Sequence, residues 1–485
     1  MRTLSPVLDP LRGFIVASGV FLAISGGAAQ AQQTVSGATS AQEPPEAQSA
    51  TSAPTSSASL PSVTSAQPSA GPAQPIDLPT ALRLAGMNNL DLALVRAAAR
   101  LAKAENDAAT LHFFPWLTLG QTYTHYTGAD QSTPGTMLEV DRQLYRRSAS
   151  AGVQLDLGNA IFQKLAARQI QSEAEHTVQA RGNDTLLAAA DAYFDLVDSR
   201  AQEGIAREAV RISRDYGKEL QRAVAIGLTN QSEALRVSVR TQQDEVRLSA
   251  AQATERRASA ALAAVLRLDP AIVLFPTERV VSPPALVPLD TPLKTLVSQA
   301  LLSRPELKAS EEAVAAAEHQ RTAAKFGPLI PSISAEAIYG QARGGLTGAL
   351  TKYRAAHDYV VGLNWQLGPG GLLDFSRTEA ADSNLDTQRL GELKVRQQIS
   401  EQVVDALSAA RSAYDQMRLA GQGVELAQKS LDLSMQRRQF GVYSVLEVIQ
   451  AQEDLTRARS DYANALAGYA KSQYALARAI DRIGS

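Results

Sequence analysis

The chain contains no cysteine, and only 5% of its 485 residues are aromatic. The absence of cysteine excludes disulfide bonds, thiol catalysis and cysteine-ligated metals, and it leaves no thiol to carry a lipid anchor. The five histidines are scattered, without a His-x-x-x-His or Glu-x-x-His pair, so we expect no dedicated metal site. No nucleophile–base set is present, and the glycine-rich stretch at residues 368–371 lacks the lysine and hydroxyl of a phosphate loop. These absences predict a protein that is not an enzyme and needs no cofactor.

The chain also has little net charge and no long apolar run in its body. The net charge of −2 leaves no broad basic surface, so we expect no nucleic-acid partner. Beyond the N-terminus no window offers about 18 uninterrupted apolar residues, and we expect no transmembrane helix. What is abundant is Ala, Gln, Leu, Arg and Ser, a composition that favours long helices packed through small side chains.

The N-terminal residues have the pattern of a secretory signal. Arg2 and Arg12 precede an apolar run over residues 13–24, and Ala29-Gln30-Ala31 supplies a small-x-small cleavage pattern. A membrane anchor is the alternative, although the run is short and glycine-rich for a span. We expect residues 1–31 to be a cleaved signal peptide. Residues 32–75, rich in Ser, Ala, Pro, Gln and Thr, are expected to be disordered.

The rest of the chain consists of two diverged copies of one unit. Residues 76–270 reappear as residues 292–485, with a linker over residues 271–291. The period of about 214 residues is too long for a solenoid and predicts two units packed side by side. The matching segments are residues 152–158 with 362–368, residues 114–118 with 330–334, and residues 226–228 with 440–442.

The residue pattern of each copy predicts two shorter helices and one very long helix. The predicted helices cover residues 79–112, 159–226 and 232–268, then residues 292–326, 373–440 and 444–480. A helix of about 70 residues is about 100 Å long, nearly the length of the two short helices end to end. We therefore expect each long helix to be flanked by a column of two short ones. In the predicted helix at residues 373–440, apolar residues recur at alternating spacings of four and three, which predicts coiled-coil packing. They are Ile399, Val403, Ala406, Ala410, Ala413, Met417, Ala420, Val424, Ala427 and Leu431.

Four segments alternate between apolar and polar side chains, as strands of an outer-membrane β-barrel do. They are residues 116–126, 150–158, 332–340 and 358–368. Aromatic residues suited to interfacial girdles accompany them: Trp116, Tyr126, Tyr339, Tyr359 and Trp365. Four strands are too few to close a barrel, which needs about eight. Either several chains share one barrel, with three chains giving about twelve strands, or the strands form a soluble sheet with one wet face.

The duplicated layout, the Pro-x-hydrophobic strand openings and the Gly-x-x-[Ser/Thr]-x-x-[Asp/Glu] hairpin tips resemble the TolC-like outer-membrane efflux proteins over residues 76–480. The resemblance implies a mainly α-helical fold with membrane β-strands, assembled as a homotrimer with a twelve-stranded β-barrel and an α-helical tunnel. It implies a passive exit duct in outer-membrane lipid, with helices extending into the periplasm, that works with a periplasmic adaptor and an inner-membrane pump. The alternatives are the duct of a type I protein secretion system and a soluble periplasmic coiled-coil adaptor.

The resemblance also implies a gate at the two helix-hairpin tips. Glu447 takes the family's inner acidic position, and Gln450 takes the second one, so one ring of charge is lost. Tyr443 stands where an arginine link often occurs, Arg438 where a tyrosine occurs, and Glu233 on the acidic position of the first tip. The other tip residues, expected to form the turns and contact the adaptor, are Gly227, Leu228, Ser232, Gly441, Val442 and Ser444.

Two of these expectations rest on helix chemistry alone. Gly227 and Gly441 should end the long helices, and Ser232 and Ser444 should cap the helices that follow. The alternative for Glu233 and Glu447 is an exposed carboxylate that is favoured at a helix N-terminus by the helix dipole.

Overall fold

The computed structural model describes residues 73–485 except residues 228, 278–284, 347–348, 440–444 and 484–485. The predicted signal peptide and residues 32–72 of the predicted disordered segment lie outside the described residues. The described part belongs to one compact unit. None of its helices combines the length and apolar character needed to cross a membrane.

The two repeats place their elements in the same order. The first has α1 (Leu78–Asn88), α2 (Leu90–Leu111), β2 (Trp116–Gln131), β3 (Met137–Asp156), α3 (Leu157–Ala225) and α4 (Gln231–Val265). The second has α5 (Leu293–Ser303), α6 (Pro305–Phe326), the 3-10 turn η1 (Gly327–Leu329), β5 (Ser332–Leu346), β6 (Arg354–Asn364), α7 (Phe375–Gln439) and α8 (Val445–Ala479).

The single helices expected at residues 79–112 and 292–326 are wrong, because each is broken into two. Asn89 has extended backbone, with φ −61° and ψ 135°, and its side chain accepts hydrogen bonds from the Asp91 and Leu92 amides. Arg304 is extended in the same way, with φ −61° and ψ 126°. Pro305 follows it, and proline disfavours helical backbone at the preceding residue.

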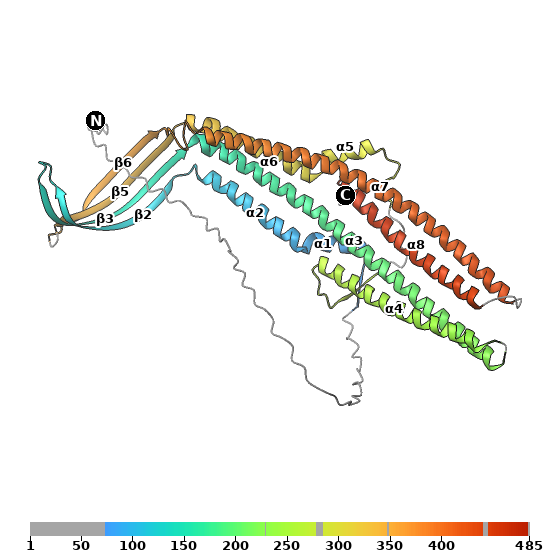
Figure 1. The fold of residues 1–485 in the computed structure, drawn as a ribbon. Helices are drawn as coiled ribbons and strands as arrows, with labels where there is room; N and C mark the ends of the chain where they lie inside the picture. The colour runs from blue at the N-terminus through green and yellow to red at the C-terminus, as the bar shows by residue number, and fades with distance from the viewer. Residues whose placement is uncertain (1–72, 228, 278–284, 347–348, 440–444, 484–485) are drawn as a thin grey trace, which may run out of the picture. The chain divides into compact units, whose positions relative to one another are not determined.

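The helices form a layer in which long helices alternate with columns of short ones. α3 packs against α2 and α4 in one column, and α6 and α8 form a second column that packs against both α3 and α7. Figure 1 shows the sheet and the hairpin tips at opposite ends of the long helices. The order of neighbours is therefore α2/α4, α3, α6/α8, α7, with the first column and α7 at the two edges.

Two apolar clusters fix the middle of this layer. One joins α1, α3 and α4 and includes the buried side chains of Ala81, Tyr193, Phe194, Leu262 and Leu266. The other joins α5, α7 and α8 and includes Leu296, Val403, Leu407, Leu476 and Ile480. The α7 residues predicted to make coiled-coil contacts lie on the less exposed side of the helix. Among them Ile399, Val403, Ala410 and Leu431 are buried.

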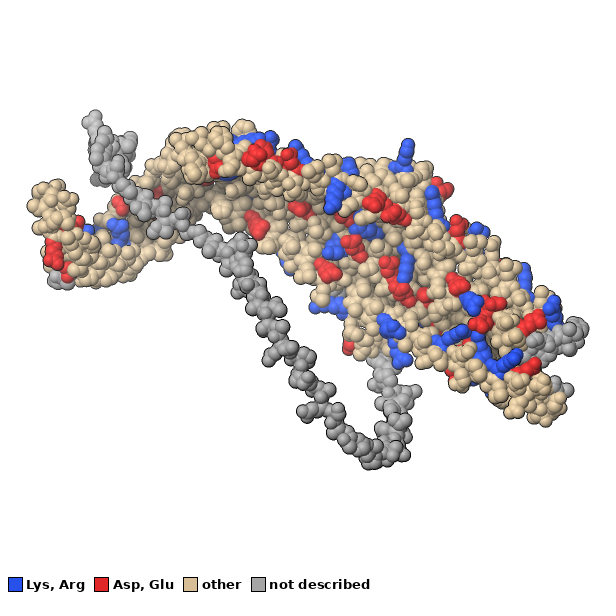
Figure 2. Space-filling view, viewed as in Figure 1, with Lys and Arg blue, Asp and Glu red and all other residues tan. Residues whose placement is uncertain are grey.

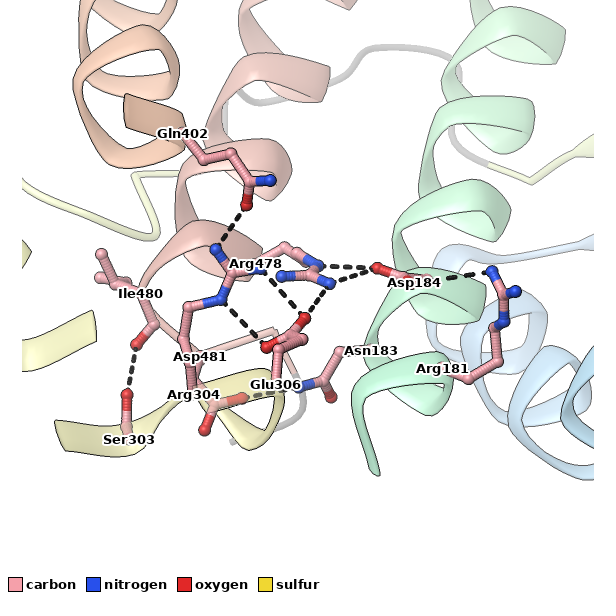
Figure 3. Close-up of polar contacts among 10 residues, drawn as sticks. All are labelled: Arg181, Asn183, Asp184, Ser303, Arg304, Glu306, Gln402, Arg478, Ile480 and Asp481. Atoms are coloured by element: carbon pink, nitrogen blue, oxygen red, sulfur yellow. Dashed lines mark hydrogen bonds and ion pairs between the residues drawn. The ribbon is translucent and has the colours of Figure 1, made fainter. Parts of the chain in front are cut away.

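A polar network ties the end of α8 to α3 and α6 (Figure 3). Arg478 pairs with Asp184 of α3 and with Glu306 of α6. Arg304 Nη2 also pairs with Glu306 Oε1 at 3.0 Å, and Arg304 Nη1 donates to Gln402 Oε1 of α7 at 2.5 Å. Because Arg304 and Arg478 are largely buried, loss of Glu306 would leave Arg304 without this carboxylate and Arg478 with Asp184, at a cost in stability.

The sheet has the strand order β2-β3-β5-β6 and is antiparallel throughout. Its register places Leu117 opposite Ala151, Ala151 opposite Ala337, and Ala337 opposite Tyr359. The predicted apolar sides of the four segments therefore share one face. The central pair β3–β5 joins the two repeats, while β2 and β6 are the free edges.

Several predicted strand bounds are wrong. β2 runs on to Gln131, β3 starts at Met137 and β5 runs on to Leu346, because the hairpins continue to pair beyond the clearly alternating residues. Residues 157–158 are helical, since the Asp156 side chain accepts from the Asn159 amide and starts α3. β6 covers Arg354–Asn364, so residues 365–368 form part of the bend before α7.

A second, small sheet was not predicted. β1 (Ala73–Ile76) pairs in parallel with β4 (Val273–Pro276). Residues 73–75 are therefore ordered, contrary to the expected disorder, and the linker between repeats contributes a strand. Ile76 and Leu274 are buried in the cluster around Tyr193, so apolar burial fixes this pairing.

Candidate functional site at the helical tips

The first hairpin tip is closed by a glycine, as expected. The Ile226 amide donates to the Arg222 carbonyl at 3.3 Å, and Gly227 follows with φ +76°. This left-handed backbone costs glycine nothing and ends α3. Leu228 lies outside the described residues.

The acidic residue of the first tip folds back on its own turn. Glu233 Oε2 accepts a hydrogen bond from Thr229 Oγ1 at 2.7 Å, and the Glu233 amide donates to the Asn230 carbonyl at 3.1 Å. Asn230 occupies the N-cap position, so the expectation that Ser232 caps α4 is wrong. Ser232 is exposed within the first helical turn.

The second tip brings together two charges of opposite sign. Glu447 lies in the first turn of α8, and its Oε1 accepts a hydrogen bond from Arg437 Nη1 at 3.1 Å. Sequence reasoning missed Arg437, which lies in the last turn of α7 one residue before Arg438. Gln450 is exposed on α8, one turn after Glu447.

Gly441, Val442, Tyr443 and Ser444 lie outside the described residues, and for Arg438 only the position near the end of α7 is described.

A charge network that sequence reasoning also missed bridges the two hairpins behind the tips. Arg240 Nη1 of α4 pairs with Glu453 Oε2 of α8 at 2.7 Å, and Arg240 Nε pairs with the buried Asp244 at 3.1 Å. Arg247 Nη2 reaches Glu453 Oε1 at 3.4 Å. Burial opposes ionisation of Glu453, but Arg240 and Arg247 outweigh it and hold its pKa below the ordinary value.

Two cavities flank this network in the seam between the hairpins. One of about 280 Å³ is lined by Ile205 of α3, Arg247 of α4 and Thr456 of α8, and another of about 270 Å³ by Ile212, Val237 and Ile449. The seam is thus incompletely packed. Ion pairs join α4 to α8 there, together with an apolar cluster nearer the tips in which Ile449 of α8 packs against Ala234 and Val237 of α4.

The contacts of the described tip residues are those of charge and packing. Within the described ranges, no group of three or more His, Asp or Glu side chains is arranged to hold a metal ion. The geometry at the tips is that of two helical hairpins with polar ends.

Residues 296–482, less than half of the chain, match the family model described as outer membrane efflux protein. This segment is similar to members of that family. Members of this family are transport ducts, which agrees with the expectation that the chain is not an enzyme. No curated protein sequence matches the chain.

Solved structures extend the likeness to both repeats. A membrane protein from Pseudomonas aeruginosa is 18% identical, with 83% of this chain and 92% of that chain covered and a TM-score of 0.72. The outer-membrane channel OprN is 20% identical, with 83% and 89% covered and a TM-score of 0.70. The CmeC outer membrane channel of Campylobacter jejuni is 17% identical, with 84% and 86% covered and a TM-score of 0.71. The chain therefore has the fold of these proteins, and the resemblance to TolC-like proteins is confirmed.

Proposed function

We propose that three copies of this chain form a passive exit duct, with a twelve-stranded barrel in the outer membrane and a helical tunnel in the periplasm. Residues 1–31 would direct export and be removed. The observation that carries the proposal is the strand order of the sheet. The edge strands β6 and β2 correspond to β3 and β5, which already join the two repeats, so β6 can pair with β2 of the next copy in the same way.

The sheet supports this in its strand order. β3 of the first repeat pairs with β5 of the second, and β2 and β6 remain as edges. A sheet with open edges is not tolerated in lipid, because unpaired backbone groups find no water there. Pairing of β6 with β2 of the next copy would repeat the β3–β5 junction and close the barrel after three copies.

The edge helices support the same arrangement. Ile205 and Ile212 of α3 face the seam with α8. The equivalent positions in the second repeat are Leu419 and Leu426 on α7, whose side chains are 56% and 67% exposed. We infer that they face the first column of a neighbouring copy.

The first column carries a matching apolar stripe. On α8, Ile449, Glu453 and Ser460 line the cavities in the seam with α3. Their equivalents on α4 are exposed large apolar residues, Leu235, Val239 and Val246. Burial of both stripes at each junction would stabilise the ring by about 25 cal/mol per Å² of apolar area removed from water.

In this duct the hairpin tips would form the periplasmic entrance, with Glu233 and Glu447 near the constriction. An adaptor that binds the tips would move the hairpins apart and open the entrance to an inner-membrane pump. A type I secretion system would use the same barrel and tunnel. A soluble coiled-coil adaptor would not need the apolar sheet face.

The decisive experiment is to extract the protein from membranes with detergent and measure its mass and its conductance in planar bilayers. We expect a trimer that resists carbonate washing and forms pores. A monomer that conducts as a complete pore, or a chain that carbonate releases from the membrane, would contradict the proposal.

A further inference from the structure

One face of the four-stranded sheet is apolar in the half nearest the helices. The pairing register aligns on it Leu117, Leu119, Ala149, Ala151, Val153, Leu155, Ile333, Ala335, Ala337, Val361 and Leu363. The opposite face carries polar side chains at the same height, among them Gln154, Ser334 and Asn364. Figure 2 shows charged side chains interspersed along the helices and few over this part of the strands. In the proposed barrel the apolar face contacts lipid.

Tyrosines mark the limit of this apolar face on the side away from the helices. Tyr339 and Tyr359 lie on it with their hydroxyl groups hydrogen-bonded, and their ring centroids are 5.5 Å apart. Tyr123 and Tyr145 pair across β2 and β3 with ring centroids 4.6 Å apart. Because tyrosine combines an apolar ring with a polar hydroxyl, such a row is typical of the headgroup level of a bilayer.

Two arginines lie on the same face, beyond Tyr339 and no farther from the helices than Tyr145. Arg147 is opposite Gln341, and Arg343 is opposite Tyr145. The guanidinium carbons of Arg147 and Arg343 lie 4.5 Å and 4.8 Å from the ring centroid of Tyr353, and Arg343 is 4.6 Å from the Tyr145 ring. Two positive charges are therefore held against one aromatic ring.

Neither guanidinium has a carboxylate partner among the residues that the structure describes. Arg147 Nε donates to the neutral amide oxygen of Gln341 at 3.2 Å. The acids on this face of β3, Asp141 and Glu139, lie nearer the hairpin turn, and Asp141 already pairs with His125 Nε2 at 2.6 Å. The arginine pair thus leaves a local positive charge next to an apolar surface.

We propose that Arg147, Arg343 and Tyr353 bind the phosphate group of an anionic membrane lipid, in the leaflet that lies away from the helices. This rests on the proposed barrel. Guanidinium groups match phosphate oxygens with paired N–H donors, and the apolar rows below the tyrosines would contact the acyl chains. Inorganic phosphate could use the same donors but would gain nothing from the apolar face, so the lipid is the occupant that the surface favours.

The chain provides a matched control on the other face of the same sheet. Arg146 and Arg354 both lie opposite Ala342, in the row next to Arg147. Strand alternation points this row away from the apolar face. The double variants R147Q/R343Q and R146Q/R354Q therefore remove the same charge from the same region but from opposite faces.

The test uses the detergent-extracted full-length protein and bis-phosphorylated lipid A as the probe, with bound lipid counted by native mass spectrometry. We expect R147Q/R343Q to bind lipid A at least about tenfold more weakly, since each basic residue near an anionic headgroup contributes roughly 1 kcal/mol. R146Q/R354Q should bind as the wild type does. Phosphatidylcholine should bind to both double variants as it binds to the wild type.

Several outcomes would overturn the site. Equal loss in both double variants would indicate general charge attraction, and unchanged binding in R147Q/R343Q would exclude these residues. Displacement of lipid A by equimolar inorganic phosphate would assign the arginines to the free anion. Conductance separates the lipid site from the proposed duct. Weak lipid binding in an R147Q/R343Q trimer that still conducts supports the site. A wild type that forms no pore contradicts the duct and the site together.

Discussion

Arg437 Nη1 donates a hydrogen bond to Glu447 Oε1 at 3.1 Å and so joins the end of α7 to the start of α8. The arginine side chain is 69% exposed and the glutamate side chain 41%, so the pair contributes at most about 1 kcal/mol to stability. Its importance lies in charge. Each Glu447 carboxylate that the proposed trimer would bring to the entrance is accompanied by the Arg437 guanidinium, and the two together are neutral.

We expect opposite effects on ion selectivity from the two members of this pair. Glu447→Gln should reduce the preference for cations and weaken block by multivalent cations, whereas Arg437→Gln should increase both, because it leaves the carboxylates uncompensated. Reversal potentials in a KCl gradient measure this. Glu425→Gln, on an exposed part of α7 away from the tip, is the control. If all three variants match the wild type, Glu447 does not line the constriction.

The inferred contact between copies predicts an assembly defect. Leu426→Glu should prevent trimer formation while the protomer stays folded, because a charge in an apolar junction is poorly solvated. Analytical ultracentrifugation in detergent measures the assembly, and circular dichroism measures helix content. Gln422→Glu, exposed on the same helix, should leave the trimer intact. A stable Leu426→Glu trimer would refute the predicted α7 junction.

The bridge between hairpins predicts local opening. Glu453→Gln removes the shared partner of Arg240 and Arg247 and should lower the free energy of unfolding by about 1 kcal/mol, since the carboxylate is partly exposed. Amide exchange should accelerate near the start of α8. Asp454→Asn is the control, because among the described residues the ion pair of that exposed carboxylate is with Arg457, at 3.8 Å. Equal exchange in both variants would mean that the bridge does not hold the hairpins together.

Replacement of two glycines of α3 by alanine should change the stability of the fold in opposite directions. A Cβ at Gly158 would lie 2.2 Å from the Gly327 carbonyl oxygen, so Gly158→Ala should cost about 1–3 kcal/mol of stability. At Gly182 no atom lies within 4 Å of the new Cβ, and Gly182→Ala should stabilise the helix by up to about 1 kcal/mol. Thermal denaturation of the two variants tests both signs. Stabilisation by Gly158→Ala would show that α3 and η1 do not approach closely.

Asp374 predicts a pH dependence at the start of α7. Its carboxylate accepts hydrogen bonds from Ser376 Oγ at 2.6 Å, the Gly370 amide at 2.8 Å and the Arg377 amide at 3.0 Å. These donors lower its pKa from 3.8 to about 2. Because the folded pKa lies below the unfolded one, the ionised carboxylate stabilises the fold above about pH 4, and this stabilisation is lost as pH falls from about 4 to about 2.

The comparison that checks this is the melting temperature of the wild type and of Asp374→Asn between pH 2 and pH 6. The wild type should be the more stable above pH 4, and the difference should shrink below it. A difference that stays constant down to pH 2 would mean that the carboxylate is not held in its ionised form.

Strong periodic signals in the sequence were sufficient for most of the fold. Alternation in residues 332–340 and 358–368 placed Ala337 and Tyr359 on one face, as the register has them. Weak local signals were not sufficient. Asn89 breaks a helix through its own side-chain hydrogen bonds, and nothing in the apolar pattern around it changes.

The candidate site was less predictable than the fold, because charges on helices do not reveal their partners. Glu447 was found through its place in the tip, but Arg437 looks like any exposed basic residue of α7. Arg240 and Glu453 meet only because α3 and α8 pack together and bring residues that are far apart in the sequence into one seam. Only the packing of the helices determines such pairs.

The parallel pairing of β1 with β4 determines where the chain enters its folded part. Ile76 is buried beside Tyr193, near the midpoint of α3. At about 1.5 Å per residue, each end of that helix is about 50 Å away. A fluorophore or affinity tag attached at Ala73 would therefore lie about 50 Å from both the mouth and the entrance of the proposed duct.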